Sequence, residues 1–213
     1  MNDLSKELEA YVMDFSTPEA VLLTELTRQT HLKILQSRML SGHIQGQLLA
    51  FIVALLKPNR ILEIGTYTGY SALCMASALV RDSGIDTIEI NDELEPFIRS
   101  FIDKSEFGNR IHLHFGDALE IIPSLNHSYD LVFMDGDKRE YVQYYELIIN
   151  RLNKGGVILA DNVLWSGKVV EPLDSNDNYT KGILEFNTLI LNDSRVENFI
   201  LPLRDGINII RKL

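Results

Sequence analysis

Two hydrophobic runs of the chain each end in side chains that carry oxygen ligands. Asp135 closes the run at 130–135, and Asp161 with Asn162 closes the run at 156–162. Both runs have the length and composition of buried strands in a parallel sheet. The carboxyl ends of such strands meet at one edge, where open α/β sheets bind ligands. Three oxygen ligands there favour a hard cation, Mg²⁺ first and Mn²⁺ or Ca²⁺ as alternatives.

A third hydrophobic run ends at Ile64 in a glycine-rich turn, which predicts a cofactor loop. Gly65 and Gly69 frame the turn, but the third glycine and the spacing of a dinucleotide fingerprint are absent. Glu63 would repel a pyrophosphate and attract an ammonium or sulfonium group. Glu89 ends the next predicted strand, where a carboxylate can accept from both ribose hydroxyls. Adenosine joined to a cationic amino acid is S-adenosylmethionine, which we favour over NAD.

Each of these residues also has a plainer interpretation when it is taken alone. The glycine turn could be a tight turn without a ligand, Glu63 a helix cap and Glu89 a surface acid. Asp137 fits the N-cap of the helix that follows it, and we prefer that interpretation. His112, His114 and His127 share no ligand spacing with the acids, so we assign them to strand or loop positions. Trp165, in the loop after Asn162, could either wall a substrate pocket or pack onto the sheet.

Strands and helices alternate from residue 60 onward, which predicts a doubly wound α/β sheet. Expected strands lie at 60–64, 86–90, 110–114, 130–134, 156–160, 196–201 and 206–211. Expected helices lie at 3–14, 18–37, 43–57, 69–81, 92–105, 117–122, 139–152 and 180–192. The short link at 202–205 forces a hairpin, so one of the last two strands should be antiparallel. We expect one domain, with N-terminal helices at 1–57, a core at 58–213, and a surface loop or lid at 163–180.

Composition narrows the function classes. The chain has 213 residues and a formal net charge of −10, which disfavours broad nucleic-acid binding. Cys74 is the only cysteine, so an intrachain disulfide and a Cys-rich zinc site are excluded. We see no uninterrupted apolar run of the roughly 18 residues that span a bilayer and no signal-peptide pattern. A cytoplasmic protein without a membrane partner is therefore expected.

From Met39 to Gly206 the chain resembles the cation-dependent class I O-methyltransferases, which include catechol and caffeoyl-coenzyme A O-methyltransferases. The similarity rests on the segments 62–72, 116–118, 130–135 with Lys138, and 161–164, and on Met39 with 46–49. The resemblance implies a Rossmann-like class I methyltransferase fold. Its sheet would have seven mostly parallel strands, a C-terminal antiparallel hairpin and extra N-terminal helices.

The resemblance also implies a role for each matching residue. Glu63, Gly65, Tyr67 and Ser71 would surround the methionine part of the cofactor, and Glu89 would hold its ribose. The remaining implied roles are adenine contacts by Asp117 and Ala118, closure of the pocket by Met39, metal ligation by Asp135, Asp161 and Asn162, and general-base catalysis by Lys138. The plainer interpretation of Lys138 is a solvated lysine at the start of a helix.

We expect transfer of a methyl group to a hydroxyl of a small catechol-like or phenolic acceptor. A divalent cation would lower the pKa of that hydroxyl, which is near 10 for a free phenol. One alternative is methylation of 5-hydroxyuridine in tRNA, and another is a cofactor-binding module without activity. The acidic composition ranks tRNA second. We also expect a homodimer. The two N-terminal helices carry more apolar residues than are needed to cover one face of the sheet: Leu22, Leu23, Leu26, Ile34 and Leu35.

Overall fold

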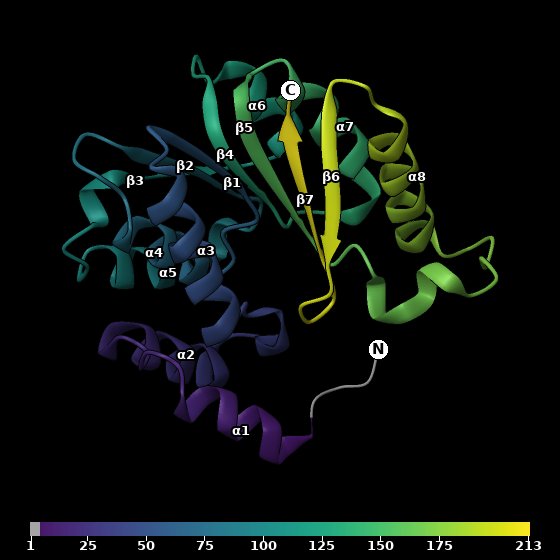
Figure 1. The fold of residues 1–213 in the computed structure, drawn as a ribbon. Helices are drawn as coiled ribbons and strands as arrows, with labels where there is room; N and C mark the ends of the chain where they lie inside the picture. Colours follow the sequence, from purple (N-terminus) through teal and green to yellow (C-terminus); the bar gives the residue numbers. More distant parts are fainter. Residues whose placement is uncertain (1–4) are drawn as a thin grey trace.

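The computed structural model describes residues 5–213 and is built on one seven-stranded sheet (Figure 1). The strand order is β3-β2-β1-β4-β5-β7-β6. Strand β7 is antiparallel to both of its neighbours, and the other pairs are parallel. The strands are β1 (Arg60–Ile64), β2 (Gly84–Glu89), β3 (Ile111–Phe115), β4 (Tyr129–Met134), β5 (Leu152–Asp161), β6 (Val196–Leu201) and β7 (Ile207–Lys212). The mostly parallel sheet with its C-terminal hairpin is confirmed.

Helices cover both faces of this sheet (Figure 1). The longer ones are α1 (Lys6–Asp14), α2 (Val21–Lys33), α3 (His43–Leu56), α4 (Tyr70–Ser77), α5 (Glu95–Ile102), α6 (Ala118–Ser124), α7 (Tyr141–Ile149) and α8 (Asn178–Asn192). Short 3-10 turns connect them: η1 (Ser37–Met39), η2 (Asp92–Leu94), η3 (Gly108–Arg110), η4 (Lys138–Glu140) and η5 (Trp165–Val170).

Two apolar cores lie on opposite faces of the sheet. Alternate strand residues supply them, so Ile61 of β1 joins one core and Leu62 the other. The first core is completed by α2, α3, α4 and α5, and the second by α6, α7 and α8. Both faces of the sheet are therefore buried, which explains why its strands read as continuous hydrophobic runs.

Some predicted boundaries were wrong, and local backbone chemistry explains the errors. The helix expected at 18–37 begins only at Val21, because Pro18 is followed by extended backbone at Ala20. It ends at Lys33, and Ile34 is again extended. The helix expected at 3–14 is α1, with Ser5 as its N-cap; positions 3 and 4 lie outside the described residues.

The region around β5 also differs from the expectation. Strand β5 begins at Leu152 rather than 156, since Leu152 pairs with Tyr129 across an irregular register that resumes at Leu131 and Val157. Helix α7 accordingly stops at Ile149 instead of 152. The segment expected as a loop at 163–180 contains η5 and the first turn of α8.

Helix α3 ties the N-terminal part of the chain to the sheet. Together with η1 it forms the segment Ser37–Leu56, which has the length and composition of a membrane span. Polar residues such as Arg38 and Gln45 interrupt its apolar sequence. A third of this segment is buried: Leu49 and Val53 of α3 are completely buried, whereas Phe51 and Leu55 are exposed. A side chain at Gly46 would collide with Tyr70 and Cys74, so α3 and α4 are in close contact there.

Candidate functional site

The candidate site lies at the carboxyl edge of the sheet, where β1 and β4 end side by side. The Asp135 N–H donates to the Ile64 carbonyl at 2.8 Å, and the Gly65 N–H donates to the Ile88 carbonyl at 2.9 Å. Gly65 has a φ of +96°, and a side chain there would collide with the Asp135 backbone. Only glycine fits this position. The predicted cofactor loop is therefore pressed against the predicted metal ligand.

A cavity opens beside this contact. Five of the predicted site residues line it: Met39, Gly65, Tyr67, Ser71 and Asp135. Met39 of η1 is half exposed at the rim, which is the placement expected of a residue that closes the pocket. Sequence reasoning missed the other lining residues, which are Leu40, Ser41, Thr66, Thr68 and Tyr70. Thr66, Thr68 and Tyr70 lie within the motif segment 62–72, and Leu40 and Ser41 follow Met39, so their position in the sequence was the available signal.

Glu63 is the buried penultimate residue of β1, and Ser71, which lines the cavity, lies close enough to lower its pKa. Thr87 Oγ1 donates to its Oε2 at 2.5 Å, whereas its Oε1 has no hydrogen-bond partner among the described residues. Burial raises the pKa of Glu63 to about 7, and the charges of Asp135 and Glu89 add to the rise. A cation in the cavity would offset this cost, because it would favour the carboxylate form. The helix-cap interpretation is wrong, since Glu63 accepts from no helix N–H within residues 5–213.

Three further predicted cofactor contacts, like Glu63, do not line this cavity, and they lie near the ends of neighbouring strands. Glu89 ends β2 and accepts from the Tyr67 N–H at 2.6 Å and the Asn91 N–H at 2.9 Å. Glu89 is buried rather than a surface acid. Asp117 follows β3 and caps α6 by accepting from the Leu119 N–H, and the next residue, Ala118, is buried. Their ribose and adenine roles stay predictions.

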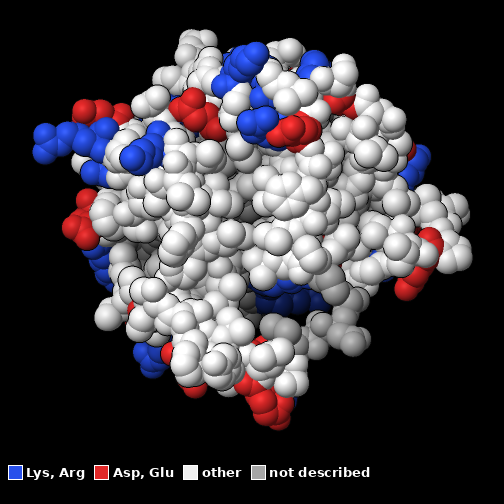
Figure 2. Space-filling view, in the orientation of Figure 1, with Lys and Arg blue, Asp and Glu red and all other residues white. Residues whose placement is uncertain are grey.

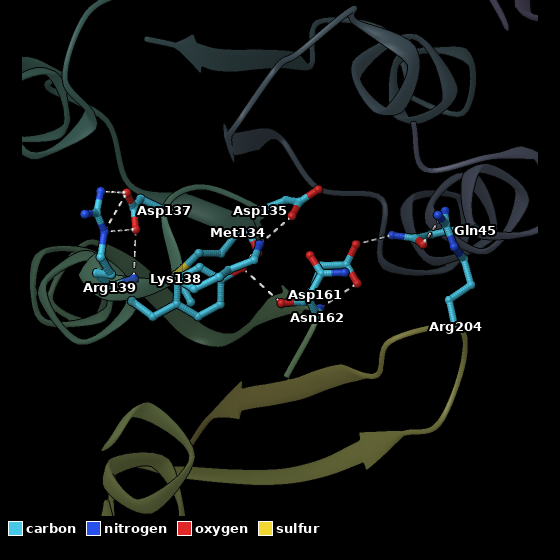
Figure 3. A network of polar contacts seen from close by, with 10 residues as sticks. Gln45, Met134, Asp135, Asp137, Lys138, Arg139, Asp161, Asn162 and Arg204 are labelled. Atoms are coloured by element: carbon cyan, nitrogen blue, oxygen red, sulfur yellow. Dashed lines mark hydrogen bonds and ion pairs between the residues drawn. The ribbon is translucent and has the colours of Figure 1, made fainter. Parts of the chain in front are cut away.

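Lys138 is buried and makes two close contacts (Figure 3). Its Nζ donates to Asp135 Oδ1 at 2.6 Å and to the Tyr141 hydroxyl at 2.7 Å. The Tyr141 hydroxyl lies 3.0 Å from the carbonyl oxygens of Met134 and Asp161, and it can donate to one of them at a time. Burial raises the pKa of Tyr141 well above its usual value, so the hydroxyl stays protonated. The interpretation of Lys138 as a solvated lysine is wrong.

Asp161 ends β5, Asn162 follows it, and both lie next to Asp135 (Figure 3). Asp161 Oδ1 accepts from the Asn162 N–H at 2.8 Å, and Oδ2 accepts from Gln45 Nε2 at 2.6 Å. Burial raises the pKa of Asp161, and the nearby Asp135 carboxylate raises it further. Asn162 has a φ of +60°, a backbone conformation that asparagine tolerates better than most residues.

The oxygen donors brought together here fit a hard divalent cation. Two carboxylates and one amide are the ligand types that Mg²⁺ and Mn²⁺ accept, and the repulsion between Asp135 and Asp161 calls for positive charge. Within residues 5–213 no cluster of three His, Cys, Asp or Glu side chains could hold a metal ion. A ligand of another type must therefore complete any site at this edge, and in the predicted set that ligand is the Asn162 amide.

The remaining candidates have other roles. Asp137 accepts from the Arg139 N–H at 2.9 Å, so its assignment as an N-cap is confirmed. His114 lies 3.2 Å from Asp86, and His127 lies 2.7 Å from Arg60, away from the predicted ligands. The Trp165 ring stacks on Tyr179 of α8 with 5.9 Å between ring centres, rather than on the sheet.

Comparison with known proteins agrees with this geometry. The chain is 33% identical over 225 aligned residues to caffeoyl-CoA O-methyltransferase 1 of Arabidopsis thaliana, covering 98% of this chain and 85% of the plant protein. The fold superposes with a TM-score of 0.91 on a Bacillus cereus O-methyltransferase solved with SAH (27% identity; 97% of each chain). It also superposes on TomG of Streptomyces achromogenes, solved with SAM (TM-score 0.90; 26% identity; 97% of this chain and 96% of that one).

The match to a family model is nearly as long as the chain. The model described as O-methyltransferase aligns with residues 13–213, which include η1, every strand and all the residues of the site described above. With the seven-stranded sheet and the strand-end site in place, the chain belongs to the O-methyltransferase family.

Proposed function

We propose that this protein is a divalent-metal-dependent O-methyltransferase that takes its methyl group from S-adenosylmethionine. One observation carries the proposal: the buried Glu63 carboxylate, one oxygen of which has no hydrogen-bond partner among residues 5–213, lies near the acidic pair Asp135 and Asp161. Glu63 is placed to attract a cationic cofactor, and Asp135 with Asp161 is placed to attract a metal ion. Structures of the Bacillus and Streptomyces relatives with SAH and SAM support the choice of cofactor.

The residues of this chain divide the work of methyl transfer between them. Asp135, Asp161 and Asn162 would hold the cation, which when bound would lower the pKa of the acceptor hydroxyl and fix its direction. When bound, S-adenosylmethionine supplies its sulfonium methyl group to the acceptor oxygen, and the electron pair of the broken C–S bond stays on sulfur. Lys138, which lies beside this set, would take the proton that leaves the acceptor oxygen when its side chain is the neutral amine, and it would become the ammonium in that step.

The acceptor we favour is a small catechol-like or phenolic hydroxyl. Two adjacent hydroxyl oxygens can both contact one metal ion, which leaves one oxygen aimed at the methyl group. The Trp165 ring, in the segment that follows Asn162, offers aromatic surface for such an acceptor. The Tyr179 ring is already in contact with Trp165 and with Arg139, whose Cζ lies 4.9 Å from the ring centre. The curated relative in Arabidopsis is named for a caffeoyl-CoA acceptor, and caffeoyl groups carry the same vicinal hydroxyls.

Surface charge supports this ranking over tRNA. Lys and Arg side chains on the face in Figure 2 lie mostly toward its edge among Asp and Glu, with one blue group in a hollow below the centre. Nucleic-acid enzymes usually gather positive charge into a patch, because phosphate neutralisation supplies much of their affinity. The segment after η5 adds the acids Glu171, Asp174 and Asp177.

The deciding experiment is a methyl-transfer assay with labelled cofactor. We expect transfer to catechol or to caffeoyl-CoA, loss of turnover with excess chelator, and recovery with Mg²⁺ or Mn²⁺. A parallel assay with tRNA that carries 5-hydroxyuridine, at low and physiological salt, tests the alternative acceptor. Full turnover in excess chelator would contradict metal dependence, and tighter binding of NAD than of S-adenosylmethionine would contradict the choice of cofactor.

We further propose that the protein is a cytoplasmic homodimer. The apolar residues of the N-terminal helices that led us to expect a dimer do not support it. Leu26 is buried, and Leu22, Leu23 and Ile34 pack against the chain's own core, so only Leu35 stays exposed. The exposed Phe51 and Leu55 on α3 are better candidates. Light scattering at micromolar concentration should give twice the chain mass of 24.2 kDa, and a monomer peak would reject the proposal.

A further inference from the structure

The Gln45 side chain connects the candidate metal site to the hairpin between β6 and β7 (Figure 3). Gln45 lies on α3 and is 1% exposed. Its Nε2 donates to Asp161 Oδ2 at 2.6 Å, and its Oε1 accepts from Arg204 Nη1 at 3.2 Å. Both polar atoms of the amide are thus used, one toward the predicted metal ligand and one away from it.

The arginine fixes which end of the amide faces Asp161. A guanidinium has donors only, so it must meet the amide oxygen, and the NH₂ group is then directed at the carboxylate. With the amide reversed, its oxygen would face the Asp161 carboxylate and its NH₂ group would face Arg204. Both contacts would be repulsive. Arg204 therefore determines that Asp161 receives a hydrogen bond from this side.

Arg204 also holds the rim of the cofactor cavity. The same Nη1 donates to the Leu40 carbonyl at 3.1 Å, and Leu40 lines the cavity. No carboxylate of residues 5–213 lies within ion-pair distance of Arg204, so these neutral oxygens are its observed partners. The residue occupies the hairpin turn with a φ of +51°, a conformation uncommon for arginine. The hairpin, α3 and the cavity rim converge on this one side chain.

We infer that Gln45 is a positioning residue for the metal site, and that Arg204 orients it. The inference rests on the proposed function, because it takes Asp161 as a metal ligand. The Gln45 amide and the Asn162 N–H each donate one hydrogen bond to a different oxygen of Asp161. These two bonds fix the orientation of the carboxylate plane. Groups that orient metal ligands in this way typically contribute 10- to 100-fold to metal affinity.

The first test measures Mn²⁺ binding to the whole protein by calorimetry and by the electron spin resonance of free Mn²⁺. Gln45→Met keeps the length of the side chain and removes both hydrogen bonds. We expect Mn²⁺ affinity to fall 10- to 100-fold. Affinity for S-adenosylhomocysteine, measured without metal, should stay unchanged, since Gln45 does not line the cavity. Unchanged Mn²⁺ affinity in Gln45→Met would overturn the inference.

The second test asks whether the two residues act in series. Arg204→Met should weaken Mn²⁺ binding in the wild-type background and have no further effect on it in Gln45→Met. Arg204 lies on an exposed hairpin, so this variant should fold even if Gln45→Met does not, and its own loss of Mn²⁺ affinity then decides the inference. Arg211→Met is the matched control, since Arg211 is exposed on β7 and pairs with Glu197. Independent, additive losses would contradict the orienting role of Arg204.

A reference variant separates this inference from the proposed function. Asp161→Asn removes the carboxylate charge and should abolish specific Mn²⁺ binding. If wild type binds Mn²⁺ no better than Asp161→Asn, metal dependence itself is wrong. If wild type binds Mn²⁺ and Gln45→Met binds it equally well, metal dependence survives and only the positioning role fails.

Discussion

Two buried carboxylates on neighbouring strands have opposite electrostatic surroundings. Glu63 of β1 pairs in register with Thr87 of β2, and Asp86 is the residue before Thr87. Asp86 lies 3.2 Å from His114 Nε2, accepts from the Tyr129 hydroxyl at 3.2 Å, and lies 3.5 Å from Arg60 Nε. Burial raises the pKa of Asp86, but His114 and Arg60 outweigh it and leave that pKa below its usual value.

Glu63 lacks such partners. Burial raises the pKa of Glu63 to about 7, and the charges of Asp135 and Glu89 add to the rise. The nearby hydroxyls of Ser71 and Thr87 lower that pKa only in part, and Oε1 accepts no hydrogen bond from residues 5–213. The contrast separates structure from function within one sheet. The negative charge of Asp86 is compensated by groups of the chain itself. The charges of Glu63 and Asp161 are not, and a bound cation would compensate them. Unbalanced buried charge beside a cavity is a marker of a functional site.

The largest expected effect is at Lys138. Lys138→Met removes the proposed base and should lower turnover by roughly 10²- to 10⁴-fold, the usual contribution of a general base. Affinity for S-adenosylmethionine should change little, because Lys138 does not line the cavity. Steady-state kinetics with catechol, with calorimetry as the control, checks both statements. Unchanged turnover would mean that the metal alone suffices to activate the hydroxyl.

Glu63→Gln tests the functional side of the comparison. Losing a charge-assisted contact of about 1.5–3 kcal/mol should weaken S-adenosylmethionine binding roughly 10- to 150-fold. Because the folded pKa of Glu63 exceeds its unfolded value, its stabilising contribution is full below about pH 4.5 and is lost as pH rises through about 7. The ligand-free variant should therefore be at least as stable as wild type at pH 8. Denaturant titrations at pH 5 and pH 8 measure this, and a clear loss of stability at pH 8 would show that Glu63 is structural.

Much of this site could be predicted because each motif is local. Asp135 and Asp161 end hydrophobic runs, and Gly65 follows a third run. The positions of all three at the carboxyl ends of strands could therefore be predicted correctly. The contact of Gln45 with Asp161 could not be predicted, since it joins residues 116 positions apart and depends on how α3 crosses the sheet edge. The early start of β5 was also missed, because Asn153, Lys154 and Gly155 look like a turn and are exposed.

Asp86→Asn tests the structural side. The change leaves the Arg60 charge without its partner and weakens two hydrogen bonds, which should cost about 1–3 kcal/mol of unfolding free energy. Arg60 is a quarter exposed, so solvent limits the loss. The folded pKa of Asp86 lies below its unfolded value, so its contribution is present above about pH 3.8 and disappears as pH falls. Binding of S-adenosylhomocysteine should be unaffected, and weaker binding would remove the distinction between the two carboxylates.

The smallest expected effect is a release of protons when the cofactor binds. With a pKa of about 7, Glu63 is half protonated at pH 7 in the free protein. An ammonium or sulfonium beside it favours the carboxylate, so binding at pH 7 should release roughly half a proton per site. Calorimetry in buffers of different ionisation enthalpy measures this number as a slope. The release should vanish in Glu63→Gln and persist in Asp86→Asn. Equal release in wild type and Glu63→Gln would assign the proton to another group and break the link between the raised pKa and cofactor binding.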